Sequence, residues 1–236
     1  MSLGAGALTL LPVTGIGEVR RGDRLGALVA RAVALHDGDV VVVTQKAVSK
    51  AEGRVVPIDE SDPDARLALV AAESVRLLRR RGDLVIAETR HGFVCANAGV
   101  DLSNVEAGHA VLLPLDPDRS ARRIRAEIRR ASGAEVAVIV SDTFGRPWRR
   151  GLTDVAIGCA GIAAVVDLRG TPDAYGRELR ATEVCVADEL AGAAELVMGK
   201  AAGVPAAVVR GVDPSLLRPG SVRAEVVRSA SEDLFR

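Results

Sequence analysis

Short apolar runs alternate with amphipathic stretches along most of this chain. Runs of strand length stand at residues 10–13, 40–43, 84–87, 136–140 and 205–209, and an alternating run stands at 182–186. Helical periodicity occupies the segment that begins at an Asp23 cap, and residues 62–82, 116–132 and 187–198. The alternation predicts an α/β or α+β architecture, with residues 1–236 forming one domain or two intimately packed subdomains.

The second of these helices has a clear expected start. Asp62 would cap it, and Pro63 would occupy its first position. Its apolar period continues to Gly82, so Arg79, Arg80 and Arg81 fall in the expected last turn, where cations favour the helix dipole.

Composition excludes several classes of partner. Charged residues make up 26% of the chain, and no run of about 18 apolar residues is present, which argues against a membrane span. A net charge of zero and 2% aromatic residues argue against nucleic-acid binding. The three cysteines are widely spaced in apolar sequence and are expected to be buried free thiols. Without a basic, signal-like N-terminus, these features predict a cytoplasmic protein.

The stretch at residues 136–162 concentrates the candidate chemistry. Asp142 follows a strand-like run and is expected at that strand's carboxyl end, where open α/β sheets bind ligands. A turn around Gly145 would then present Arg146 and Arg149, whose guanidinium groups suit phosphate or carboxylate. The pattern is that of a metal–phosphate site, and a surface turn with solvated arginines remains the alternative.

Two further polar segments suit the same chemistry. Residues 44–54 follow a strand and carry Lys46 and Lys50, which could bind phosphate oxygens or simply be solvated. Residues 91–105 hold Asp101 and Asn104, which could offer oxygens to a hard cation or form an ordinary Asx turn.

Taken together, these segments resemble the coenzyme F-420-0:L-glutamate ligase family, also called the F-420 γ-glutamyl ligases. The resemblance rests on LPVTGIGEVRRGD at 11–23, DGDVVVVTQKAVSKAEGR at 37–54, ANAGVDLSNV at 96–105, LLPLDPDRSA at 112–121, SDTFGRPWRRGLTDVAIGCAG at 141–161, DAYGREL at 173–179 and VADELAGAAELVMGK at 186–200. These motifs span nearly the whole chain in the family's order.

The resemblance implies GTP-dependent amide ligation of L-glutamate to F-420-0, then γ-linked glutamate addition, through an acyl phosphate. It implies Mg²⁺ or Mn²⁺, often with stimulation by K⁺, and an intertwined homodimer without a Walker loop. The implied GTP contacts are Ile16, Gly17, Glu18, Val19, Gln45, Lys50, Asn104, Met198, Gly199, Lys200, Gly203 and Val204. The implied metal ligands are Asp101, Asp142 and Thr143. Asp142, Arg146 and Arg149 are the candidate catalytic residues, and Arg146, Arg149 or Arg150 would bind the acidic substrate.

Two positions depart from the family pattern. Gln45 replaces a small hydroxyl residue, and Lys200 stands where archaeal relatives can offer an acidic ligand to a second metal, which leaves the number of metals open. In the actinobacterial form a nitroreductase-like domain follows, and the DLF at residues 233–235 resembles the approach to that junction. A non-catalytic guanine-nucleotide-binding module and a ligase for a related dehydro-F-420-0 intermediate are the alternative functions.

Overall fold

A five-stranded mixed sheet forms the centre of the computed structural model, which describes residues 6–62 and 64–233. Its strand order is β1 (Thr9–Pro12), β12 (Ala206–Arg210), β2 (Val40–Thr44), β8 (Ala137–Arg146) and β9 (Arg149–Ala160). β2 and β8 are parallel, and the other neighbours are antiparallel. The mixed α/β class expected from the sequence is confirmed.

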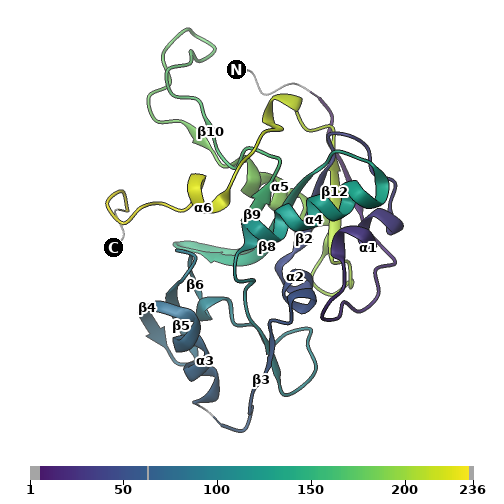
Figure 1. Ribbon diagram of the computed structural model, residues 1–236. Helices are drawn as coiled ribbons and strands as arrows, with labels where there is room; N and C mark the ends of the chain where they lie inside the picture. Colours follow the sequence, from purple (N-terminus) through teal and green to yellow (C-terminus); the bar gives the residue numbers. More distant parts are fainter. Residues whose placement is uncertain (1–5, 63, 234–236) are drawn as a thin grey trace.

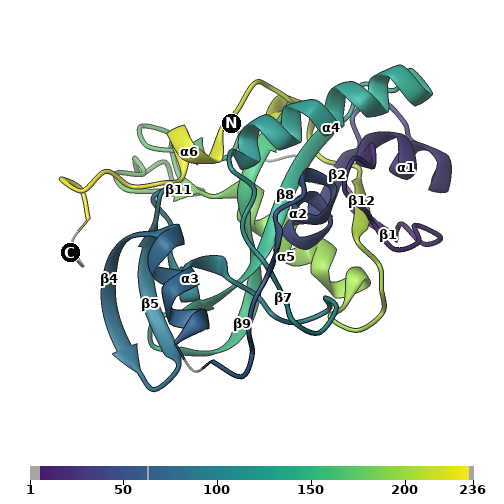
Figure 2. The same cartoon turned by 60° about the horizontal axis from the view of Figure 1, so that its bottom comes forward.

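Helices cover both faces of this sheet (Figure 2). On one face lie α1 (Leu25–Ala32), α2 (Gln45–Glu52) and α4 (Pro117–Ser132), and on the other lies α5 (Val186–Met198). In β2, Val41 and Val43 pack into the first core, while Val40 and Val42 pack into the second. Burial on both faces explains why this strand is an uninterrupted valine run rather than an alternating one.

A smaller three-stranded sheet lies beside the far end of the β8–β9 hairpin (Figure 1). It contains β4 (Ser74–Arg81), β5 (Leu84–Thr89) and β6 (Val94–Ala96), and it packs with α3 (Ala65–Glu73) and the 3₁₀ turn η1 (Asn97–Gly99) around a third core. Short ladders join β3 (Val55–Pro57) to β7 (His109–Val111), and β10 (Val166–Asp167) to β11 (Glu183–Val184). The turn η2 (Pro214–Leu216) and helix α6 (Val222–Glu225) follow β12.

The helix predicted over residues 62–82 is wrong in its second half. The chain leaves α3 at Glu73 and forms β4, which pairs with β5 through the tight turn at Gly82, where φ is +59°. Cross-strand pairing with β5 therefore overrides the helical apolar period. The arginines at 79–81 lie on a sheet edge rather than at a helix end, and charge there discourages pairing with another chain.

The structure confirms one predicted helix start and corrects two predicted N-caps. The helix predicted over residues 116–132 begins where expected, and Asp116 caps α4 by accepting a hydrogen bond from the Arg119 N–H at 2.9 Å. Asp23 does not cap α1, since its carboxylate accepts from the Arg20 N–H and the N-cap position is Arg24. Asp62 likewise is not the cap of α3. Pro63 and residues 234–236, on which other expectations fell, lie outside the described residues.

The central stretch is an extended hairpin. β8 continues six residues past Val140 to Arg146, and the chain reverses at residues 147–148 rather than at Gly145. Asp142 pairs with Val155 of β9, so it lies inside a ladder and not at a strand's end, which corrects that prediction. Pairing with β9 satisfies the backbone of a sequence whose polarity suggests a loop.

Helix α2 occupies most of the polar segment that follows β2. Thr44 caps it by accepting a hydrogen bond from the Ala47 N–H, and Gly53 ends it at φ +71°. In the described part of the chain, no helix has the length and apolarity to cross a bilayer. Cys95 and Cys159 are buried free thiols, as expected, and Cys185 is half-buried.

Candidate functional site

A cleft of about 980 Å³ opens between the main sheet and the loops beside it. Thirteen of the seventeen residues predicted for the site line it: Gly17, Glu18, Val19, Gln45, Lys50, Asp101, Asn104, Asp142, Thr143, Gly199, Lys200, Gly203 and Val204. A second cleft, of about 290 Å³, lies between α3 and the β4–β5 hairpin, and none of the predicted residues lines it. The scattered segments therefore converge on one place.

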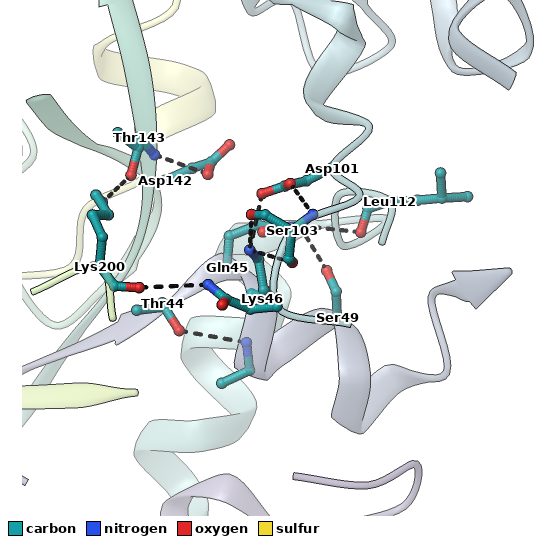
Figure 3. A network of polar contacts seen from close by, with 12 residues as sticks. Thr44, Gln45, Lys46, Ser49, Asp101, Ser103, Leu112, Asp142, Thr143 and Lys200 are labelled. Carbon is teal, nitrogen blue, oxygen red and sulfur yellow. Dashed lines mark hydrogen bonds and ion pairs between the residues drawn. The ribbon is translucent and has the colours of Figure 1, made fainter. Parts of the chain in front are cut away.

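One wall of the cleft joins α2 to the loop after η1 (Figure 3). The Lys46 ammonium lies 2.9 Å from an Asp101 carboxylate oxygen and donates to the main-chain and side-chain oxygens of Ser103. Asp101 also accepts from the Ser103 N–H at 2.7 Å, which closes an Asx turn. The carboxylate is therefore held in place by both its own loop and a neighbouring helix.

The facing wall is the β8–β9 ladder (Figure 3). Asp142 accepts from the Thr143 N–H at 2.8 Å, and the Thr143 hydroxyl donates to Asp154 at 2.6 Å. Asp154 is only 3% exposed and also accepts from the Ser141 hydroxyl at 2.9 Å. Lys200, which follows α5, bonds to Thr143 and lies 2.9 Å from Asp154.

Asp101 and Asp142 differ in their electrostatics. Burial raises the pKa of Asp142 to about 7; the Thr143 N–H offsets part of this shift, while the charges of Asp154 and Asp101 add to it. Burial also raises the pKa of Asp101, but the Ser103 N–H and the Lys46 ammonium outweigh it, so the net shift is downward. Of the two carboxylates, Asp142 is therefore the one whose charge is less fully compensated.

Lys50 and Gln45 line the cleft from α2. Lys50 forms an ion pair with Glu18, which ties the segment at residues 16–19 to the helix. Gln45 is 3% exposed and donates to the Ser49 hydroxyl and to the Leu112 carbonyl. Its amide is committed to internal bonds, so this departure from the family pattern is accommodated structurally.

The donor set of this cleft fits one divalent ion bound together with phosphates. No three His, Cys, Asp or Glu side chains of residues 6–62 and 64–233 gather to hold a metal alone. Mg²⁺, however, usually takes one or two carboxylates and completes its shell with waters and phosphate oxygens. Asp101 and Asp142 supply such a pair, whereas the Thr143 hydroxyl already donates to Asp154 and contacts the Lys200 ammonium.

Four predicted residues do not line the cleft. Ile16 packs against the first core, and Met198 is fully buried in the second. Arg146 and Arg149 pair with each other at the exposed end of the β8–β9 hairpin. Their roles remain predictions that require the hairpin end to reach a substrate.

The sequence did not reveal one ion pair and one charged residue that organise the cleft. Lys46 was a candidate phosphate ligand, but its ion-pair partner Asp101 is 55 positions away. Asp154 had a weak local signal, since it is a lone acid at the start of the apolar run at residues 155–160. A carboxylate among strand residues marks a buried polar contact, because burial without partners is costly.

Comparison with known proteins identifies the family of this chain. The family model described as "F420-0:Gamma-glutamyl ligase" matches residues 15–211. The "Coenzyme F420:L-glutamate ligase" of Methanopyrus kandleri is 44% identical over 99% of both chains. The proteins of the same name from Methanothermobacter thermautotrophicus and Archaeoglobus fulgidus are each 42% identical, covering 97% and 96% of this chain and 99% and 96% of their own. On this evidence the chain belongs to the F420-0:gamma-glutamyl ligase family.

Proposed function

We propose that this protein joins L-glutamate to coenzyme F-420-0 through an amide bond and then adds further glutamates through γ-linkages, using GTP. The observation that supports this most directly is the convergence of Asp101, Asp142, Lys46 and Lys50 on one cleft in a member of this ligase family. We take residues 1–236 as one catalytic domain acting in the cytoplasm.

The proposed chemistry has two steps. A carboxylate is a poor acylating agent, so the terminal carboxylate of F-420-0 first attacks the γ-phosphorus of GTP and releases GDP. The glutamate amine then attacks the acyl carbon, phosphate leaves with the bonding electron pair, and the amine gives up a proton. Phosphoryl transfer of this kind depends on positioning and charge neutralisation rather than on a covalent protein nucleophile.

Different residues of the cleft would position the substrates and neutralise the phosphate charge. Asp101 and Asp142 would hold Mg²⁺ or Mn²⁺, which neutralises phosphate charge when bound. Lys50 would bind nucleotide phosphates once its ion pair with Glu18 breaks. Lys46, on the same helix, forms an ion pair with Asp101. The segments at 17–19 and 199–204, with Asn104, would surround the nucleotide. The proposal includes stimulation by K⁺.

The same proposal includes a homodimer. Val75 and Leu77 of β4 are 70% and 50% exposed, and Trp148 and Leu152 of the hairpin are 86% and 68% exposed. Exposed apolar side chains on a sheet edge and a hairpin end are typical of protein interfaces. A dimer would also offer Arg146 and Arg149 a route to the acidic substrate of a second copy.

Ligation is tested by mass spectrometry of purified protein incubated with GTP, Mn²⁺, F-420-0 and L-glutamate. We expect products heavier by successive glutamate residues, no product with a chelator, and a dimer by light scattering. Equal product without nucleotide would refute the proposed chemistry. GTP binding without ligation would favour a non-catalytic module, and preference for dehydro-F-420-0 in a competition assay would identify the alternative precursor.

A further inference from the structure

Lys200 joins the two walls of the cleft. Its ammonium reaches Asp154 and Thr143 on the β8–β9 ladder, and Figure 3 shows it pointing toward Thr143. Its carbonyl oxygen lies 3.5 Å from the side-chain amide nitrogen of Asn104, on the opposite loop. One residue therefore contacts both sides of the space where the substrates are proposed to bind.

The backbone around Lys200 is shaped for this position. Gly199 ends α5 at φ +63°, a value that L side chains rarely adopt, and Gly203 closes the loop at φ +66°. Asn104 itself has φ +54°, which asparagine tolerates better than most residues. Both ends of the loop at residues 199–204 thus have backbone conformations that favour glycine.

Asp154 is the anchor of this arrangement. Its Oδ2 accepts from the Ser141 hydroxyl, and its Oδ1 accepts from both the Thr143 hydroxyl and the Lys200 ammonium. The Asp154 side chain is 2% exposed, whereas that of Lys200 is 57% exposed. An exposed ion pair contributes little, but the buried Asp154 carboxylate loses the one cationic partner it has within residues 6–62 and 64–233 when the lysine moves away.

We propose that Asp154 is a positioning residue that, through Lys200, holds the loop at residues 199–204 against Asn104 and so shapes the nucleotide side of the cleft. The part that concerns nucleotide rests on the function proposed above. Glu195, which bonds to the same ammonium at 2.9 Å from α5, supports the lysine from its own helix and makes no bond to the facing ladder.

Two variants remove the contact from opposite ends. Asp154→Asn keeps an oxygen for the hydroxyls of Ser141 and Thr143, and Lys200→Met keeps the stem of the side chain. Asp188→Asn is the matched control, because Asp188 of α5 accepts from the Ala156 N–H of β9 outside the cleft. Amide hydrogen exchange of residues 199–204 without nucleotide, and the KM for GTP, are measured on all three.

Both variants are expected to speed exchange in the loop and to raise the KM for GTP about tenfold, which corresponds to 1.4 kcal/mol. kcat and the KM for glutamate should change less than about threefold, because the loop acts on binding. The double variant should be no worse than the poorer single variant, since both remove one interaction. The control should match the unmodified protein.

Normal loop exchange and normal KM in Asp154→Asn would overturn the proposal, leaving Lys200 as at most a direct ligand. Faster exchange throughout the chain in that variant would also overturn it, because Asp154 would then be merely structural. Failure of the unmodified protein to ligate would refute the proposed function alone, since loop exchange is measured without substrates.

Discussion

Replacing Asp142 with asparagine should stabilise the metal-free protein while removing its activity. The folded chain raises the pKa of Asp142 from 3.8 to about 7. A carboxyl group whose pKa is raised by folding binds its proton more tightly in the folded state. Its negative charge therefore does not reduce the free energy of unfolding below pH 4, and it reduces that free energy by the full amount above pH 7. This difference in pKa between the unfolded and folded states corresponds to about 4 kcal/mol.

The expected effect is smaller than that figure. Asp142 is half-buried on a wide cleft, and water there screens part of the cost, so we expect a gain of about 2 kcal/mol for Asp142→Asn at pH 8. At pH 4 the two proteins should be nearly equal, because the aspartate is then protonated. Asp101→Asn is the contrasting variant: the pKa of Asp101 is lowered, so its loss should destabilise the protein at pH 8 and matter less as pH falls below 4.

Urea unfolding in a chelating buffer at both pH values measures these differences. Ligation should fall by a factor of roughly a hundred or more in Asp142→Asn, and Mn²⁺ should raise the melting temperature of the unmodified protein only. The reasoning is refuted if Asp142→Asn is less stable at pH 8 and ligates normally. Asp142 would then serve only as the acceptor for the Thr143 N–H.

Two further predictions concern the scaffold. Arg210→Gln should lower the urea midpoint of unfolding at pH 7, because it removes two 2.8 Å hydrogen bonds from the buried Asp39. Burial raises the pKa of Asp39, but the bonds and charge of Arg210 together with the His36 N–H outweigh burial, so the net pKa is lowered. The difference between the two proteins should therefore shrink below pH 4. Gly158→Ala should lower the free energy of unfolding by about 3 kcal/mol, since the new Cβ would lie 2.3 Å from the Pro117 carbonyl carbon. Gly192→Ala is the control: no atom lies nearer than 3.6 Å to its Cβ, so it should be neutral or stabilising in thermal melts. Equal melting of the two glycine variants would contradict the close approach of α4 to β9.

The local sequence by itself determined those elements whose formation does not depend on one particular tertiary partner. The valine run at residues 40–43 could only be a strand buried on both faces, and Asp116 with Pro117 at the start of an amphipathic stretch specified α4. Asp101, Asp142 and Lys50 were candidates from their own segments, but only the family resemblance grouped them in one site, because groups tens of positions apart carry no local signal that they meet.

Tertiary contacts decided the rest. Residues 74–81 have a helical apolar period, yet pairing with β5 makes them a strand. Polar residues 141–146 have the composition of a loop, yet β9 supplies their hydrogen bonds and carries Asp142 into the middle of a ladder. The role of Asp154 depends on the folded chain, which places Ser141, Thr143 and Lys200 around its carboxylate. A sequence states which groups a residue can offer, but the energy of a buried charge or an unpaired backbone depends on neighbours that only the fold brings together.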